Sequence, residues 1–220
     1  MQENLFKLIN FKEIQRYLNT FDMHIELFKD IKKLKKIINL IPNDDYPYRW
    51  DAAFNEEYLE TNDYFCILLY QNKNIIGTYA ARHMDIKNYL YDIRHIFLED
   101  SVSESLNFES LGLDKNSWYS SLQWISKKSR GQRIGIFLDY IKKSLVFEIY
   151  NADYNYAIHK EDLLNYHINK LNYDHSDWLM TIKKGIIGSS NSPEDKVYYL
   201  CNVSKQAWLT KQNDLYNNYL

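Results

Sequence analysis

The sequence predicts an α/β fold of the α+β kind, in which strands and helices alternate along one domain of 220 residues. The runs YFCILLY and IIGTYAARHMDI, separated by the polar stretch QNKN, predict an antiparallel hairpin over residues 64–86. WYSSLQWIS, residues 118–126, predicts a strand that leads through a cationic turn directly into a helix. Residues 153–182 predict a strand, a helix and a further strand. A chain of this length buries enough apolar surface for a real core.

The first part of the chain predicts two helices and a short strand. Apolar residues at helical spacing indicate an N-terminal helix over residues 3–18, and the alternating MHIEL indicates a strand over 23–27. Asp30 is the expected N-cap of a helix that ends at Pro42 and turns its lysines toward solvent. Residues 42–62 are predicted to form a loop and a short helix.

The later elements follow from the same periodicities. Residues 89–116 fit a helix or a strand followed by a polar loop, and we interpret them as an insertion. The remaining predictions are helices over 135–145 and 159–174, strands over 153–158, 177–182 and 197–203, a glycine- and serine-rich loop over 184–196, and a polar tail. Since the sequence contains neither a repeat nor a linker, residues 1–220 are predicted to form a single domain.

The composition limits which classes of binding partner and which cellular compartment are expected. The net charge of -2 argues against a nucleic acid or an anionic membrane as partner. No apolar run approaches the roughly 18 to 20 residues that span a bilayer, and the N-terminus lacks a signal-peptide pattern. Cys66 and Cys201 lie far apart in apolar runs, which predicts buried thiols and a reducing compartment. The sequence therefore predicts a cytoplasmic protein. The 20 tyrosines fit either codon bias or an aromatic-lined binding surface.

A cationic turn before the central helix is the feature most suggestive of chemistry. Four basic residues and two of the chain's six glycines fall between Lys127 and Gly135. A turn at a helix N-terminus exposes backbone N–H groups where the helix dipole also favours negative charge. Glycines allow close approach of a ligand to the backbone, which predicts a site for a diphosphate. An exposed basic turn without a ligand is the alternative.

The turn resembles the acyl-CoA-binding segment of the GNAT superfamily of N-acyltransferases. That segment is a strand, the pattern V-x-P-x-[YF]-R-G-x-G-[IL]-[GA] and a helix, and ISKKSRGQRIGIFL is similar to it. Lys127 and Ser129 replace the Pro and the aromatic residue, and Arg133 replaces the middle Gly. The positions that match are Ile125, Arg130, Gly131, Ile134 and Gly135. LLNYHINKLNYD resembles the family's late helix pattern, A-x-x-L-Y-E-K-L-G-F.

The resemblance covers about residues 23–205 and implies a GNAT-like fold. Its sheet would be mixed and mostly antiparallel, with flanking helices, an extra N-terminal helix over 1–22 and an insertion at 89–116. It implies acetyl-CoA or another acyl-CoA as co-substrate and no metal. The implied cofactor-binding residues are Trp124, Ile125, Ser126, Lys128, Arg130, Gly131, Gln132, Arg133, Ile134 and Gly135. A backbone N–H around Trp124 to Ser126 would polarise the acyl carbonyl.

Family enzymes often use a tyrosine of the late helix as the acid for the departing thiolate. The aligned position is Ile168, which has no proton to give. Tyr166 and His167 are its near neighbours but point in other directions at about 100° per residue. Tyr166 is therefore kept as the candidate catalytic residue, with a packing role or a helix-surface role as its alternative. Water as proton source is a further option.

The sequence does not single out a general base. Ser121 and Gln123 lie on the strand before the turn but are weak bases, and the remaining candidates are Glu57, His83, Asp85 and His95. His159, His167 and His175 are spaced by eight, which is not a metal-ligand pattern on one helix face.

The resemblance implies direct transfer of an acyl group from acyl-CoA to an amine on a small molecule or peptide. One alternative is a longer acyl donor carried on a carrier protein, as in relatives of acyl-homoserine-lactone synthases. Another is a non-catalytic CoA-binding or interaction module with the same fold. Binding of nucleic acid by KKSRGQR is disfavoured by the net charge. The acceptor and the oligomeric state stay open, a homodimer being one option.

Overall fold

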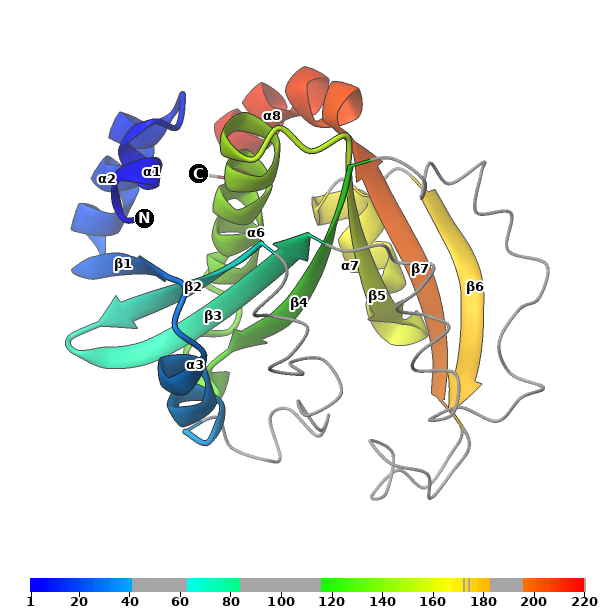
Figure 1. The fold of residues 1–220 in the computed structure, drawn as a ribbon, viewed down its shortest axis with the longest axis horizontal. Coiled ribbons are helices and arrows are strands. Elements are labelled where there is room, and N and C mark those ends of the chain that lie inside the picture. The colour runs from blue at the N-terminus through cyan, green and yellow to red at the C-terminus, as the bar shows by residue number, and fades with distance from the viewer. Residues whose placement is uncertain (41–62, 84–115, 172, 174, 183–195, 220) are drawn as a thin grey trace.

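The structure of the chain is a computed structural model, and it describes residues 1–40, 63–83, 116–171, 173, 175–182 and 196–219 (Figure 1). The predicted loop and short helix over 42–62, most of the predicted insertion at 89–116 and the predicted loop at 184–196 lie outside these residues. The division into a single domain with an insertion therefore stays a prediction.

Within the described residues, seven strands form one sheet. In spatial order they are β1 (Met23–Phe28), β2 (Tyr64–Gln71), β3 (Asn74–His83), β4 (Ser117–Ile125), β5 (Tyr154–Lys160), β7 (Lys196–Ser204) and β6 (His175–Ile182). Neighbouring strands are antiparallel except β4 and β5, which are parallel. The predicted mixed, mostly antiparallel sheet is thus confirmed.

The predicted hairpin is the β2–β3 pair, and its turn is shorter than the sequence suggested. Gln71 and Asn74 belong to the strands and pair with each other, so only Asn72 and Lys73 form the turn. Both have positive φ, 48° and 65°, as the two central residues of a type I′ turn require. Asn accepts this left-handed conformation readily, whereas in Lys it carries a small cost in backbone strain.

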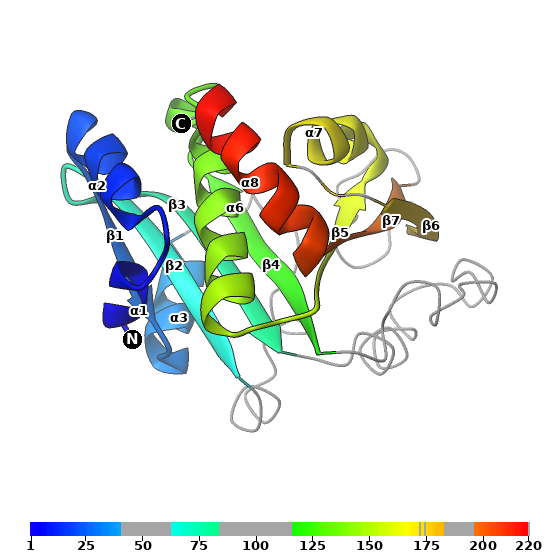
Figure 2. The same ribbon diagram turned by 90° about the horizontal axis from the view of Figure 1, so that it is seen from above.

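Helices cover both faces of the sheet (Figure 2). On one face α3 (Ile31–Ile38) packs through Leu34 and Ile37, and the Asp30 carboxylate caps it by accepting from the Lys33 N–H at 3.0 Å, as predicted. The other face carries α1 (Glu3–Phe6), α2 (Phe11–Thr20), α6 (Ile134–Ser144), α7 (Glu161–Leu171) and α8 (Lys205–Tyr219). The sheet is therefore the middle layer between two helical layers.

Helix α6 lies at the centre of the larger layer. Phe137, Leu138, Ile141 and Leu145, which the periodicity placed on one helix, are fully buried. A β-carbon at Gly77 of β3 would lie 2.8 Å from Leu138 Cδ1, so the glycine permits the close approach of helix and sheet. The helix continues as the π-helical segment η5 (Leu145–Ile149).

Two local predictions at the chain ends are wrong. The single N-terminal helix is two helices, and the residues between them bind other elements. The Ile9 N–H donates to Glu148 Oε2 at 2.9 Å, and the Asn10 amide donates to the Tyr140 hydroxyl. The polar tail is helix α8, whose Trp208 is completely buried against Tyr140. Tertiary contacts, which local periodicity does not encode, determine the secondary structure at both ends of the chain.

Candidate functional site

Strands β4 and β5 pair with each other along only about half of their length. Their ladder runs from the pair Ser117–Tyr154 to the pair Ser120–Ala157, although β4 continues to Ile125 and β5 to Lys160. Figure 1 shows the two strands diverging beyond this rung. We call the rung Ser120–Ala157 the fork. Past the fork, the backbone groups of β4 that face β5 have no ladder partner on that strand.

Near the end of β4, the backbone N–H of Ile125 faces the fork side. The Ser126 N–H donates to the Ile76 carbonyl at 2.9 Å, so it is engaged on the β3 side. Because successive N–H groups of a strand alternate in direction, the N–H of Ile125 faces the side of β5. Of the three residues expected to polarise an acyl carbonyl, Ile125 is thus the one with suitable geometry.

A tight turn joins β4 to α6. It begins with the 3₁₀ helix η4 (Lys127–Ser129), and the Ser126 hydroxyl donates to the Ser129 hydroxyl at 2.8 Å. Gly131 has φ 81°, a conformation that favours glycine, and a β-carbon there would meet no atom within 4 Å. Gly131 is thus required by the backbone and leaves open space beside it.

Arg133, which stands where the GNAT pattern has its middle glycine, has a left-handed backbone conformation. It is the N-cap of α6 with φ 61° and ψ 6°, and its side chain does not cap the helix. A left-handed conformation costs a non-glycine residue roughly 1 to 2 kcal/mol. The turn therefore carries a guanidinium at a residue whose backbone conformation favours glycine.

Six consecutive backbone N–H groups at this helix start have no acceptor among the described residues. The first N–H of α6 with a partner is that of Phe137, which donates to the Arg133 carbonyl at 3.1 Å. We call the preceding groups the amide row, and they belong to Gly131, Gln132, Arg133, Ile134, Gly135 and Ile136. Since α6 has 11 residues, the positive end of its dipole coincides with the amide row.

Exposed cations surround the amide row. Lys127, Lys128, Arg130 and Arg133 are exposed, as is Gln132. The Arg130 Nε donates to the Ile125 carbonyl at 3.1 Å, which ties this guanidinium to the end of β4. Positive side chains and backbone donors thus converge where β4 meets α6, an arrangement suited to an anion.

Two of the residues predicted to bind the cofactor have buried side chains. The indole of Trp124 packs with Leu34 and Ile37 on the α3 face of the sheet, and Ile134 lies in the core beneath α6. Any contact that these two make with a ligand in the turn is therefore through the backbone.

Tyr166 of α7 reaches the start of α6. A β-carbon at Gly135 would lie 3.2 Å from the Tyr166 hydroxyl oxygen, so that hydroxyl rests over the first turn of the helix. Burial, with a smaller effect of Asp139, raises the pKa of Tyr166 to about 12, although the residue is 38% exposed. The structure thus brings Tyr166 beside the amide row, where its hydroxyl keeps its proton at neutral pH.

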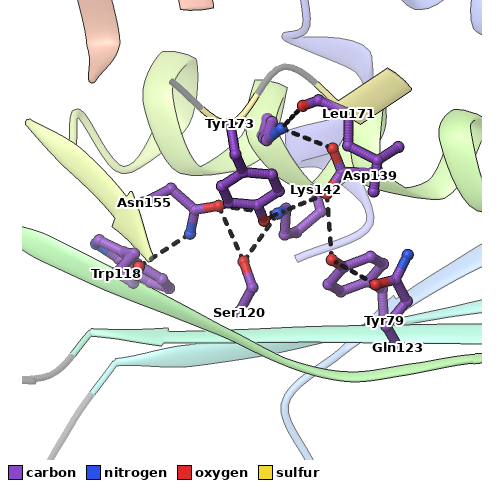
Figure 3. A network of polar contacts seen from close by, with 10 residues as sticks. Tyr79, Trp118, Ser120, Gln123, Asp139, Lys142, Asn155, Leu171 and Tyr173 are labelled. Carbon is purple, nitrogen blue, oxygen red and sulfur yellow. Dashed lines mark hydrogen bonds and ion pairs between the residues drawn. The ribbon is translucent and has the colours of Figure 1, made fainter. Parts of the chain in front are cut away.

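Further along α6 lies a buried group of charges that the sequence analysis did not identify. Lys142 Nζ lies 2.8 Å from Asp139 Oδ1, and Lys143 Nζ lies 2.8 Å from Asp139 Oδ2. Both lysine side chains are 0% exposed. We call these three residues the cation cluster. Figure 3 shows that polar groups of the sheet and of the α7–β6 connection converge on it.

The cation cluster contacts several strands. Lys142 donates to Ser120 Oγ and Asn155 Oδ1, each at 2.8 Å, and to the Tyr173 hydroxyl at 3.1 Å. Lys143 donates to the Leu171 carbonyl and lies 4.0 Å from the centre of the Tyr173 ring. The Lys142 ammonium therefore contacts both β4, at Ser120, and β5, at Asn155.

A polar chain leads from the cation cluster toward the end of β4. The Tyr79 hydroxyl lies 3.2 Å from Asp139 Oδ1 and 3.3 Å from the side-chain oxygen of Gln123. The single proton of this hydroxyl can be donated to only one of the two oxygens at a time. The Tyr79 hydroxyl therefore links the Asp139 carboxylate to the side chain of Gln123.

Burial shifts the ionisation of this cluster. Burial lowers the pKa of Lys142 to about 7, the Lys143 charge adds to that effect and Asp139 opposes it. Burial alone would raise the pKa of Asp139, but the two lysines hold it below its ordinary value. With all three groups charged the cluster carries one surplus positive charge, and the proton of Lys142 is the one whose loss removes it.

A pair of histidines borders the cluster. The rings of His159 and His167 stack with their centroids 3.3 Å apart, and both are edge-on to Tyr173. Burial lowers both pKa values, that of His167 to about 3, where Asp139 opposes the effect, and the nearby lysines lower both further. Both histidines are therefore neutral at physiological pH.

The remaining candidates for a general base divide into two groups. His83 lies at the end of β3, exposed, with its ring edge-on to Trp118. Glu57, Asp85 and His95, like the side chains of Ser121 and His175, lie outside the described residues.

Three further predictions concern cysteines, metals and membranes. Cys66 and Cys201 are completely buried, as predicted. Among the residues that the structure describes, no three His, Cys, Asp or Glu side chains gather as metal ligands would. No described helix combines the length and apolarity needed to cross a bilayer.

No protein-family model matches the sequence, and no curated protein matches it. The structure is similar to that of FeeM, an N-acyl amino acid synthase from uncultured soil microbes, with a TM-score of 0.52 and 9% identity over 88% of this chain and 96% of that one. It is also similar to a spermidine N-acetyltransferase from Vibrio cholerae, with a TM-score of 0.56 and 11% identity over 86% and 98% of the two chains. At these identities the likeness shows the fold alone. The chain has the fold of the GNAT superfamily, as the resemblance of the turn predicted.

Proposed function

We propose that the protein is an acyltransferase that moves an acyl group directly from acyl-CoA to an amine on a small molecule or peptide. The observation that carries the proposal is the amide row: six N–H groups without a described acceptor, at the start of a helix and beside exposed arginines. A diphosphate matches this arrangement in charge and in the number of acceptor oxygens.

The fork provides a place for the acyl arm of the coenzyme. A ligand whose diphosphate sits on the amide row has its acyl arm beside the last residues of β4, where the strand has left β5. The Ile125 N–H faces that side and is a donor to the thioester carbonyl oxygen, on which negative charge develops during attack by the amine. The thioester carbon would then form a bond to the amine nitrogen and release the CoA thiolate.

Proton transfers complete the proposed reaction. The attacking nitrogen must lose a proton, and the departing thiolate must gain one. Tyr166 supplies the second if the thiolate comes within reach of its hydroxyl, because a group with a pKa of about 12 is fully protonated at neutral pH. Water is the alternative donor, since a thiolate is a good leaving group.

Calorimetry with acetyl-CoA tests the proposal directly. Arg130→Glu places a carboxylate beside the diphosphate, and we expect it to weaken binding on the order of 100-fold, since two charge-assisted contacts are affected. Arg133→Gly removes a guanidinium but relieves the strained backbone, and we expect roughly tenfold weaker binding together with higher stability. Lys32→Glu, an exposed charge reversal on α3, is the matched control.

The outcome discriminates between the functions considered. Equal affinity of the wild type, Arg130→Glu and Lys32→Glu would remove the turn from the coenzyme site. Tight CoA binding without thiol release in the presence of any amine would instead indicate a non-catalytic module. Thermal shifts with acetyl-CoA and a long-chain acyl-CoA distinguish a short donor from a long one.

A further inference from the structure

The fork between β4 and β5 is held by side chains as well as by the ladder. Asn155 of β5 donates through Nδ2 to the Trp118 carbonyl of β4 at 2.9 Å. Its Oδ1 accepts from the Ser120 hydroxyl of β4 at 2.9 Å and from Lys142 at 2.8 Å. These contacts lie on the last rungs before the strands separate. The fork is therefore a polar junction that joins two strands to α6 (Figure 3).

Lys142 is the centre of this junction. Its ammonium has three protons and four acceptors within 3.1 Å: Ser120 Oγ, Asn155 Oδ1, the Tyr173 hydroxyl and Asp139 Oδ1. The neutral amine would donate only two hydrogen bonds, and the attraction to Asp139 would disappear. With two protons left, the neutral amine cannot donate to Ser120, Asn155 and Tyr173 at the same time.

The surroundings favour loss of that proton. The groups that face Lys142 are Asp139 and Lys143 on α6, Tyr79 on β3, Ser120 on β4, Asn155 and His159 on β5, and His167 and Tyr173 on and after α7. Among these, Asp139 alone is negatively charged, and Lys143 balances it. Burial with one surplus positive charge lowers the pKa of Lys142 to about 7.

We propose that Lys142 is a positioning residue for the transfer reaction: its ammonium fixes the point where β4 and β5 diverge, and loss of its proton loosens that point. The proposal rests on the proposed function, because the strands past the fork are the ones that would hold the acyl arm of the coenzyme. It predicts that the affinity for acyl-CoA falls as the pH rises through about 7.

Lys143 provides a matched control for Lys142. It is the next residue on α6, is equally buried and is paired to the same carboxylate, and it contacts the Leu171 carbonyl and the rings of Tyr173 and Trp208. Lys142→Met and Lys143→Met each remove one buried positive charge. The first removes the contacts to Ser120 of β4 and Asn155 of β5.

The experiment measures the affinity for acetyl-CoA between about pH 6.5 and about pH 9, where its phosphates titrate little. We expect the wild-type affinity to fall on the order of tenfold across this range. The Lys142→Met variant should bind acetyl-CoA weakly, with an affinity that does not depend on pH. The Lys143→Met variant should retain tight binding below about pH 7. Identical pH profiles for the wild type and Lys142→Met, or equal losses in the two variants, would overturn the proposal.

Amide hydrogen exchange provides a readout that does not depend on the coenzyme. Lys142→Met should accelerate exchange at the last β4–β5 rung, Ser120–Ala157, and Lys143→Met should not. If the wild type binds no acyl-CoA, the proposed function fails, and the exchange experiment still decides the role of Lys142. If Lys142→Met does not fold, Ser120→Ala takes its place, and unchanged exchange at Ala157 would contradict the proposal.

Discussion

Helix α6 carries two groups of cations in opposite environments. Arg130 and Arg133 precede its first turn and are exposed, whereas Lys142 and Lys143 follow Asp139 in its second half and are completely buried. The exposed cations keep their hydration and can exchange it for a ligand. The buried cations have lost theirs, so a carboxylate and hydrogen bonds inside the protein must compensate. A charge change in the first group should alter binding, and one in the second should alter folding.

The largest expected effect tests the buried group. Asp139→Asn leaves Lys142 and Lys143 in the core without their counter-ion, so we expect a loss of about 3 to 5 kcal/mol in the free energy of unfolding. Denaturant unfolding measures it, and Asp214→Asn on the exposed side of α8 should change it by no more than about 0.5 kcal/mol. A loss below about 1 kcal/mol for Asp139→Asn would show that water reaches the cluster.

The pH dependence of stability tests the buried cations separately from the exposed ones, because it requires no mutation of the turn. The folded pKa of Lys142, about 7, lies below that of the unfolded chain, 10.5, so the unfolded state binds the extra proton between these values. Stability should therefore rise with pH above about 7, by at most about 1.4 kcal/mol per pH unit. The buried histidines add a loss of stability as the pH falls below about 6.5.

Denaturant unfolding at intervals from about pH 5 to about pH 8 measures both the rise above about pH 7 and the loss below about pH 6.5, because ionisation of cysteine in the unfolded chain is half complete only at about pH 8.5. In the Lys142→Met variant, the rise of stability above about pH 7 should disappear, and the loss of stability below about pH 6.5 should remain. If stability in that variant still rose above about pH 7 with the same slope, the rise would belong to another titrating group.

A smaller effect is expected in the turn. Gly131→Ala forces a β-carbon into a left-handed conformation, and we expect a loss of roughly 1 kcal/mol in stability. Gly131→Asn should cost less, because Asn tolerates that conformation better. The midpoints of thermal unfolding compare the two variants. If Ala and Asn had equal effects, the positive φ of Gly131 would not be the cause.

The smallest effect concerns the contact between Gly135 and Tyr166. Alanine favours the helix, but its β-carbon would lie 3.2 Å from the Tyr166 hydroxyl, so Gly135→Ala alone should change stability by less than about 0.5 kcal/mol. In the Tyr166→Phe background the same substitution should stabilise by about 0.5 to 1 kcal/mol. A double-mutant cycle measures this coupling, and additivity would place the hydroxyl away from Gly135.

How far the sequence could predict the site differs between the two groups. The turn is contiguous, so its glycines, its cations and the flanking strand and helix could be read from one segment. The cation cluster could have been suspected, because α6 is apolar on nearly all sides and leaves Asp139, Lys142 and Lys143 no solvent face. Its partners Ser120, Asn155 and Tyr173 belong to three distant segments, and no local pattern connects them with α6.

The sequence by itself determined the hairpin, the cap at Asp30, the course of α6 and the strand–turn–helix around Gly131, because each depends on periodicity or turn chemistry within a few residues. Tertiary structure decided the break at Ile9 and Asn10, the docking of α8 through Trp208, the fork between β4 and β5, and the environment of Lys142. In each of these cases the deciding partner is distant in the chain, and only packing brings together the groups that satisfy one another's hydrogen bonds and charge.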